Sequence, residues 1–591
     1  MTRALVTAGA LVLAFVAGRA TLRRRAVLLL GRHGRALAPA AVASVWLVGL
    51  LVGQATRSVA GMSWVAAAAV LALWAVARRR FAPLRIRAPR WTYLDWAMFL
   101  FVAVVFLSVD LWDLEVHRAL TSQVLHGNLP PRALNDPRFP LAYHAVYDAL
   151  VAIVLTVLPI DLQPAMGLVS TGCVALTLSN LQALSRIFFP RRGTAQLARA
   201  LFMFGFGPVF IRCAASGWNL DEMHGHTAQS YVELILRRPA GLGMAFFTLA
   251  LAVVLPCYRR PPDGGRDLAT ARLKWLVPVL LVLPQMSEEA TFFLFLYLAP
   301  LVLARRLGVR TVVLLVAATL VSALQSGVVL GVLGHRAMAT PTLHFSWPPR
   351  LPTWAYEQNG VSLLSRAASA FYWLELGPVF LAALAFALAG RDAGRRAVGG
   401  AFLAGAAVAV FASTGAWKKS DLDRFFFYGT PPVFMLAAAL PDRIFGALRR
   451  GRLAPGSLLA GFGLMVCAPT TVYPAWQARN RLSGEFSAHA LGGDLRRTLA
   501  PVGQREPILT TVDRANDVIM AGFLVIAPIE TNEVTRITTG LFDDYVRANA
   551  RRAVWLFLPE GDARLAGRPA VASDGGFVLA RAATQGPSPG R

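Results

Sequence analysis

Acidic, imidazole and aromatic side chains gather in one stretch of an otherwise apolar sequence. In order along the chain they are Asp110, Asp113, His117, Tyr143, His144 and Asp148. Residues four apart share one face of a helix, which pairs Asp113 with His117 and His144 with Asp148. Two such carboxylate–imidazole faces could transfer protons or bind a metal ion. The alternative is a solvated loop whose acids only cap helices; a single Asp-x-x-x-His would fit it, whereas the whole string favours chemistry.

Three further groups of polar residues could bind a substrate or a metal ion. They are Lys418, Lys419 and Arg424 in one loop, Glu288 beside Glu289 between two apolar runs, and His224 with His226 beside Asp221 and Glu222. Cations suit a phosphate group, buried carboxylates must be solvated or paired, and two histidines beside acids can hold a metal ion. The alternatives are membrane-surface anchors for the cations and a solvated loop for the histidines. The segment 334–371 mixes aromatic and charged residues, which suits either a sugar cleft or the aromatic belt of a bilayer.

The composition indicates what kind of protein carries these residues. Of the 591 residues, 56% are hydrophobic and 15% are charged, against about 25% charged in soluble domains. This excludes a soluble enzyme and indicates a polytopic membrane protein. The net charge of +27 comes almost entirely from arginine, and arginine clusters at the ends of apolar runs are topology signals, so no nucleic-acid partner is implied. The four cysteines have no spacing typical of a zinc site or a disulfide framework.

The apolar runs predict an all-α membrane protein with about 13–15 transmembrane helices. They lie at 4–20, 36–53, 61–77, 92–109, 142–160, 164–185, 194–212, 240–258, 268–284, 289–304, 310–333, 372–390, 396–413, 427–445 and 456–474. One run is ambiguous: residues 142–160 either span the membrane or form a half-buried, re-entrant helix, because the flanking charges require a single crossing between 141 and 186. The pair of runs at 268–284 and 289–304 is short for two spans.

Arginine density predicts which loops face the cytoplasm. Arginine-rich loops lie at 22–35, 78–90, 186–192, 259–274, 305–310, 391–396 and 443–452. The outward segments are then 54–60, 110–141, 213–238, 285–288, 334–371, 414–426 and the tail from 475. We expect additional N-terminal helices over 1–91, a transmembrane core over 92–477 with the external loop 110–141, and a small extracytoplasmic α/β domain over 478–591. The predicted location is the bacterial cytoplasmic membrane.

The stretch 110–148 resembles a known superfamily. A carboxylate follows an early span, an amphipathic helix ends in Gly127-Asn128-Leu129-Pro130-Pro131, and Leu141-Ala142-Tyr143-His144 begins the next helix. This pattern is similar to that of the GT-C superfamily of membrane glycosyltransferases, and closest to its uncharacterised bacterial and archaeal members. The resemblance implies many helices, an external loop with a catalytic acid and an extracytoplasmic C-terminal domain. It also implies transfer of a sugar, with inversion, from a polyprenyl-phosphate donor to a glycan, lipid or protein acceptor.

The resemblance also assigns roles to individual residues. Asp113 matches the loop acid that acts as general base, with Asp110 as the competing candidate and His117 as a further catalytic candidate. Tyr143, His144 and Asp148 match polar positions that flank this acid and are candidates for substrate binding. The outward cations at Lys418, Lys419 and Arg424, together with Glu288, become candidates for binding the lipid phosphate and the sugar. A divalent metal ion, Mg or Mn, could assist, with Asp113, His117, His224 and His226 as candidate ligands.

Two other functions fit a protein of this composition. A transporter or flippase of lipid-linked sugars would need charges inside its spans and internal repeats, and the sequence has few of the former and none of the latter. A non-catalytic partner in envelope-glycan assembly would have no need of the acids and histidines in 110–148. The sequence therefore favours the glycosyltransferase.

Overall fold

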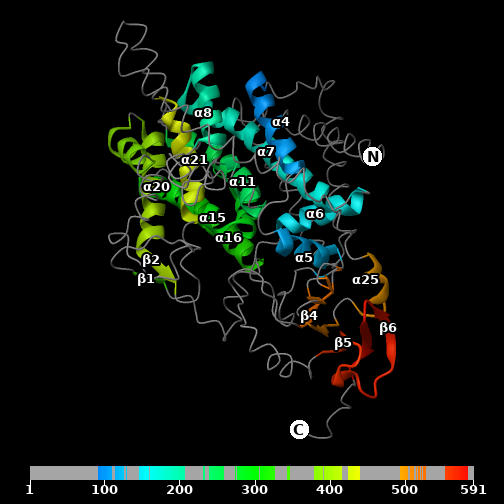
Figure 1. Cartoon of the computed structure of the whole chain (residues 1–591). Helices are drawn as coiled ribbons and strands as arrows, with labels where there is room; N and C mark the ends of the chain where they lie inside the picture. Colours follow the sequence, from blue (N-terminus) through cyan, green and yellow to red (C-terminus); the bar gives the residue numbers. More distant parts are fainter. Residues whose placement is uncertain are drawn as a thin grey trace, which may run out of the picture.

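The computed structural model describes a helical bundle with a small sheet near the C-terminus (Figure 1). The described residues are 91–108, 114–125, 128, 146–158, 160, 162–205, 231–232, 238–258, 273, 276–304, 307–325, 343–345, 379–390, 392–414, 424–439, 493–503, 506–511, 514–515, 517–518, 521, 523–526 and 553–582. The predicted spans at 4–20, 36–53, 61–77 and 456–474 lie outside these residues, as does nearly all of the N-terminal segment 1–91.

Most of the remaining apolar runs form helices where the sequence predicts them. The helices are α4 (Tyr93–Ser108), α5 (Leu114–Leu125), α6 (Val146–Val157), α7 (Leu162–Phe188), α8 (Arg192–Phe204), α11 (Arg238–Val254), the 3-10 helix η3 (Leu255–Tyr258), α13 (Leu276–Leu280), α14 (Leu283–Met286), α15 (Glu288–Leu303), α16 (Val309–Gln325), a helix at Val379–Ala389, α20 (Ala393–Phe411) and α21 (Arg424–Ala437). The predicted helical character of the core is thus confirmed for the described residues.

Two of the described helices are long and apolar enough to cross a membrane, namely Pro164–Phe188 and Ala240–Tyr258. At 1.5 Å per residue, a helix needs about 20 residues to cross a hydrocarbon layer of about 30 Å. Shorter apolar helices begin at Tyr93, Val146, Val309, Val379 and Phe426.

The structure differs from the sequence prediction at one run. Helix α6 has 12 residues within the described part of 142–160. Residues 142–145 lie outside the described part of the chain, so both alternatives for this run stay predictions. The run 268–284 was predicted as one span, but its described part forms the two short helices α13 and α14. A turn at 281–282 separates them, and a proline near the start of α14 suits a new helix rather than a continued one.

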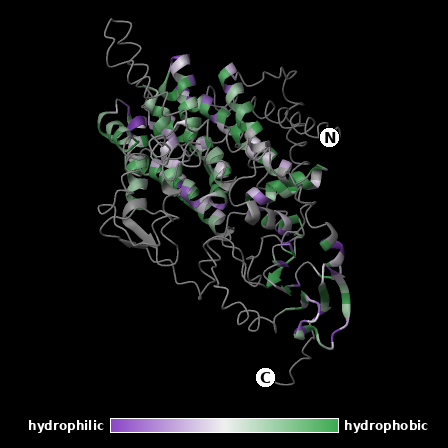
Figure 2. Cartoon of the chain, viewed as in Figure 1, coloured by the Kyte–Doolittle hydropathy of each residue, from purple (hydrophilic) through white to green (hydrophobic). Residues whose placement is uncertain are grey.

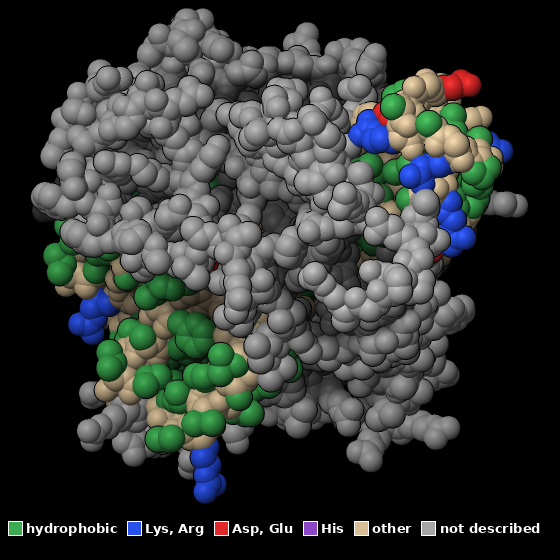
Figure 3. Space-filling model, turned by 90° about the horizontal axis from the view of Figure 1, so that it is seen from below, with side chains coloured by type: hydrophobic (Ala, Val, Ile, Leu, Met, Phe, Trp, Pro, Cys, Tyr) green, Lys and Arg blue, Asp and Glu red, His purple; other side chains and the backbone are tan. Residues whose placement is uncertain are grey.

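Hydrophobic residues make up much of the helices of the bundle (Figure 2), and large hydrophobic side chains lie on the outside of several of them (Figure 3). Leu100 and Val104 of α4, Val313 and Leu320 of α16, and Leu388 are all more than half exposed. Contiguous exposed apolar surface is rare on soluble monomers. Helices with satisfied backbones and apolar outer faces are instead the arrangement that lipid requires.

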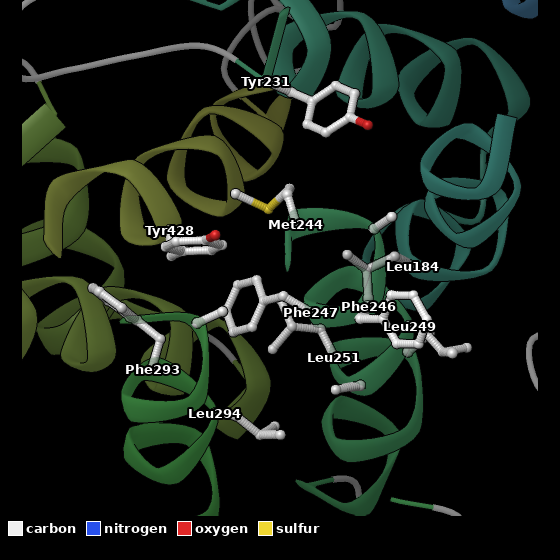
Figure 4. Close-up of a cluster of buried hydrophobic side chains, with 14 of the residues drawn as sticks. Leu184, Tyr231, Met244, Phe246, Phe247, Leu249, Leu251, Phe293, Leu294 and Tyr428 are labelled. Atoms are coloured by element: carbon white, nitrogen blue, oxygen red, sulfur yellow. The ribbon is translucent and has the colours of Figure 1, made fainter. Parts of the chain in front are cut away.

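The centre of the bundle is a cluster of aromatic and aliphatic side chains (Figure 4). Phe247 of α11 packs edge-on against Phe293 of α15 and Tyr428 of α21, with ring centroids 6.4 Å and 5.7 Å apart. Gly405 of α20 faces the ring of Phe293 so closely that a Cβ atom would overlap it. Glycine at this position therefore lets α20 approach α15.

The C-terminal part is a five-stranded sheet with strand order β4-β3-β5-β7-β6. Its elements are α25 (Gly493–Thr498), β3 (Ile508–Thr510), β4 (Val525–Ile526), β5 (Trp555–Pro559), β6 (Ala570–Asp574) and β7 (Phe577–Arg581). Strands β4, β3 and β5 are parallel, whereas β5, β7 and β6 are antiparallel. The sheet and helix α25 agree with the α/β character predicted for 478–591.

A short ladder joins two distant segments of the chain. Strand β1 (Leu343–Phe345) pairs antiparallel with β2 (Ala412–Thr414), and His344 lies opposite Ser413. In Figure 1 this ladder, α5 and the C-terminal sheet all lie toward the lower end of the bundle. Strand β1 falls within the predicted outward segment 334–371, and β2 covers the end of the predicted span 396–413 and the first residue of 414–426.

Candidate functional site

A buried contact between α5 and α6 joins the two halves of the polar stretch. The Nδ1 atom of His117 lies 3.0 Å from Oδ1 and 3.3 Å from Oδ2 of Asp148. The hydroxyl of Thr121 donates to the same carboxylate at 3.3 Å. All three residues are fully buried. A carboxylate withdrawn from water in this way needs such partners, because an unpaired buried charge is costly.

Local sequence explains why these side chains meet. His117 and Thr121 are four residues apart on α5, so both face α6. Asp148 lies in the first turn of α6, where the positive end of the helix dipole stabilises a carboxylate.

Tyr147 holds this contact against the rest of the bundle. Its ring lies edge-on to the His117 imidazole, with centroids 5.8 Å apart. Its hydroxyl donates to the carbonyl of Met166 at 3.0 Å and lies 3.1 Å from the hydroxyl of Ser170, both on α7. The imidazole is therefore fixed by a carboxylate from one direction and by an aromatic ring from another.

This arrangement can orient an imidazole for proton transfer. An ionised carboxylate only accepts hydrogen bonds, so with Asp148 ionised the proton of a neutral His117 lies on Nδ1 and the lone pair on Nε2. In many acid–base sites a buried acid orients the histidine that transfers the proton. The contact between His117 and Asp148 also holds α5 in a defined rotation.

The far end of α5 is closed by a backbone hydrogen bond. The N–H of Asn128 donates to the carbonyl of Gln123 at 3.0 Å, which is the six-to-one bond found where a helix is followed by glycine. Residue 127 is glycine. The Gly-x-x-Pro-Pro pattern that contributed to the resemblance therefore has a local structural reason at its first residue.

The structure gives Asp148 partners on another helix. Its carboxylate is bonded to His117 and Thr121, and the pairing with His144 that the spacing predicts falls outside the described residues. The other predicted site residues, which lie outside the described part of the chain, are Asp110, Asp113, Tyr143, His144, His224, His226, Lys418 and Lys419. Arg424 is the first residue of α21.

Glu288 opens helix α15 beside a serine cap. The hydroxyl oxygen of Ser287 accepts from the N–H of Ala290 at 3.0 Å and donates to Oε2 of Glu289 at 2.7 Å. Acidic residues in a first helical turn are stabilised by the helix dipole. The hydrogen bond from Ser287 gives Glu289 a structural role at the start of the helix. Glu288 is half-buried and stays a candidate for substrate binding.

The described residues contain no group of three His, Cys, Asp or Glu side chains that could hold a metal ion. The carboxylate of Asp148 is already engaged by His117 and Thr121. The described part of the chain thus does not itself form a metal site, and the predicted ligands Asp113, His224 and His226 lie beyond it.

The bundle contains a second buried carboxylate, that of Asp95, and the sequence did not predict its partner. Arg199 of α8 donates from Nε to Oδ1 of Asp95 at 2.7 Å and from Nη2 to Oδ2 at 3.0 Å. Thr92 and Gln182 also donate to this carboxylate, and Arg199 further bonds to Ser185 of α7. The signal was visible as an arginine inside the apolar run 194–212, because an intramembrane charge requires a partner.

The similarity of this chain to known proteins is a similarity of fold. No protein-family profile and no curated protein matches the sequence. Among solved structures, the apo oligosaccharyltransferase of Archaeoglobus fulgidus matches at 14% identity with a TM-score of 0.46, over 79% of this chain and 69% of that one. ArnT from Cupriavidus metallidurans bound to undecaprenyl phosphate matches at 13% identity with a TM-score of 0.44, over 85% of this chain and 100% of that one. Both proteins are GT-C membrane glycosyltransferases, the superfamily that the 110–148 motif resembles.

Proposed function

We propose that this protein is a membrane glycosyltransferase that moves a sugar from a polyprenyl-phosphate donor to an acceptor outside the cytoplasm. The observation that carries the proposal is the buried contact between His117 and Asp148. It fixes the helix that follows the two loop acids, at the end of the bundle where the C-terminal sheet lies (Figure 1). The donor class and the bacterial cytoplasmic membrane follow from the sequence resemblance and the charge pattern.

In the proposed reaction Asp113 is the general base. Its carboxylate accepts the proton of the acceptor hydroxyl, and the acceptor oxygen forms a bond to the anomeric carbon. The bond between that carbon and the phosphate oxygen breaks, and its electron pair leaves with the polyprenyl phosphate. Displacement from the opposite face inverts the anomeric centre. Asp110 is the competing base.

His117 and Asp148 are positioning residues in this proposal. Helix α5 begins at Leu114, directly after Asp113, so the rotation and depth of α5 set the position of the base. Misplacement of a catalytic group by about 1 Å can cost about 100-fold in rate. A buried, doubly accepting carboxylate on α6 is a suitable means of preventing such a shift.

The remaining predicted residues supply substrate contacts. Lys418, Lys419 and Arg424 would stabilise the charge that develops on the departing phosphate. Tyr143, His144 and Glu288 would bind the sugar; no step of the mechanism depends on a metal ion. Transfer assays in EDTA, followed by addition of Mg or Mn, test whether one is required.

The experiment is sugar transfer by the full chain in liposomes that contain polyprenyl-phosphate sugars and an acceptor. We expect Asp113→Asn to abolish transfer while the protein still inserts and unfolds at the wild-type temperature. Asp517→Asn removes an exposed carboxylate of the C-terminal domain and is the matched control. Full activity in both Asp113→Asn and Asp110→Asn would contradict the assignment of the base. Net movement of the lipid-linked sugar without transfer would instead support a flippase.

A further inference from the structure

Helix α5 is shared by two hydrophobic cores. Its residues His117, Thr121 and Val124 face the helix bundle, where Val124 belongs to the main core and the other two contact Asp148. Leu120, one turn along the same helix, belongs to the core of the C-terminal domain instead. No part of its side chain is exposed.

The contacts with the C-terminal domain are both apolar and polar. The core that surrounds Leu120 comprises Leu495, Leu499, Val502, Ile508, Ala515, Val518, Ala521, Phe523, Val525, Trp555, Phe557 and Leu579. Arg496 of α25 donates from Nη2 to the hydroxyl of Ser122 at 3.4 Å and from Nε to the carbonyl of Ala521 at 2.9 Å. Arg496 thus links α5 to the sheet domain through two hydrogen bonds.

The two sets of contacts use different parts of the surface of α5. At about 100° per residue, His117, Thr121 and Val124 fall within a stripe about 60° wide. Leu120 lies beside this stripe, about 40° from Val124, and Ser122 lies on the far side of the helix, about 100° from Thr121. A helix of 12 residues is marginal in isolation, so α5 depends on both sets of contacts for its position.

We propose that the C-terminal domain is a positioning element of the transfer reaction, with Leu120 and Arg496 as its positioning residues. The domain holds α5 through Leu120 and Ser122 while Asp148 holds it through His117 and Thr121, and together they set the position of the acid that directly precedes the helix. The inference rests on the proposed function and extends it to a part of the chain almost 400 residues away in sequence from the loop.

The test uses the full chain in liposomes and compares Leu120→Ala and Arg496→Met with wild type. We expect kcat for sugar transfer to fall about 10- to 100-fold in each variant, with the KM for the donor unchanged. Hydrogen exchange of residues 114–125 should become faster in both variants. Leu120→Met conserves the buried volume and should restore kcat.

The matched control is Leu558→Ala in β5. Leu558 is as buried as Leu120 but lies in the small core on the other face of the sheet. Its loss should lower the unfolding temperature of the chain while leaving both kcat and the exchange of α5 at wild-type values. If Leu558→Ala reduces kcat as much as Leu120→Ala, the effect is general destabilisation and the inference is wrong.

The outcomes separate this inference from the proposed function. If the wild-type protein transfers sugar and the two variants exchange faster in α5 without loss of kcat, only the positioning role of the domain fails. If the wild-type protein transfers no sugar with any donor, the proposed function fails. The inference then fails with it, because the domain would have no transfer reaction to position.

Discussion

The bundle contains two buried carboxylates whose hydrogen-bond partners differ. Asp95, at the start of α4, is bound by the guanidinium of Arg199 through two parallel hydrogen bonds. Asp148, at the start of α6, is bound by the imidazole of His117 and by a hydroxyl. In Figure 1 the α4–α8 end is at the top, whereas α5 and the C-terminal sheet lie below.

The difference lies in what each partner can do. A guanidinium stays charged at all accessible pH values and forms a rigid fork that matches a carboxylate. An imidazole has two ring nitrogens, and a carboxylate bound at one of them fixes its tautomer and its orientation. The Asp95–Arg199 pair is therefore suited to fixing α4 against α7 and α8, and the His117–Asp148 pair to orienting an imidazole between α5 and α6.

The largest expected effect is on stability, at the arginine. Arg199→Met leaves the carboxylate of Asp95 buried without its counter-ion, which should cost about 3–5 kcal/mol. We expect a large fall in the thermal unfolding midpoint of the full chain in detergent. The double variant Asp95→Leu with Arg199→Met removes both charges and should recover much of the loss. A wild-type midpoint in Arg199→Met alone would contradict the structural role of the pair.

The second effect is on activity, at the histidine. Asp148→Asn keeps the shape of the side chain but weakens the orientation of His117, and we expect sugar transfer to fall about 100-fold. The unfolding midpoint should fall by less than in Arg199→Met, because a neutral amide leaves no unpaired charge. Thr121→Val, which removes the weaker 3.3 Å bond, should have a smaller effect on transfer. Equal rates of sugar transfer in wild type and Asp148→Asn would contradict the positioning role of Asp148. The His117–Asp148 pair would then have only a structural role, like the Asp95–Arg199 pair.

The aromatic core allows a third comparison, between two glycines of α20 and without charged groups. Gly405→Ala would press a methyl group into the ring of Phe293, and overpacking of this kind typically costs about 1–3 kcal/mol. Gly400 lies on the same helix with open space around its Cα. Gly400→Ala should be neutral or stabilise the protein by about 0.5–1 kcal/mol. Thermal unfolding of the two variants measures the difference. Equal unfolding midpoints for Gly405→Ala and Gly400→Ala would mean that α20 does not pack against Phe293 as described.

The sequence was a good guide to elements and a poor guide to partners. Apolar runs predicted the helices because burial and lipid exposure both act on stretches of about 20 residues. The short helices α13 and α14 were missed, because a turn between two apolar segments hardly changes mean hydropathy.

Partner choice depends on contacts between distant parts of the chain. His117 and Asp148 are 31 residues apart, and Asp95 and Arg199 are 104 apart. Spacing within a helix identifies only candidates a few residues away. Contacts between residues this far apart depend on the packing of α5 on α6, and of α4 on α7 and α8.

The smallest expected effect is at an acid that remains in contact with water. In the C-terminal domain, the indole N–H of Trp555 donates to Oε2 of Glu506 at 2.6 Å, and the N–H of Gly503 donates to the same oxygen at 3.0 Å. These bonds, with help from the charge of Arg581, lower the pKa of Glu506 below its ordinary value. Because the folded state favours the ionised form, the contribution to stability is present above the unfolded pKa of about 4.3 and is lost as the pH falls through the lower folded value.

Glu506→Gln in the full chain tests this contribution, which is at most about 0.5 kcal/mol because the side chain is largely solvated. We expect the variant to unfold at a slightly lower temperature than wild type at pH 7, and the difference to vanish at a pH below the folded pKa. Glu560→Gln removes an exposed carboxylate of the same domain and controls for net charge. A difference that grows as the pH falls would reverse the sign. It would mean that desolvation of the partly buried Glu506 outweighs its hydrogen bonds with Trp555 and Gly503.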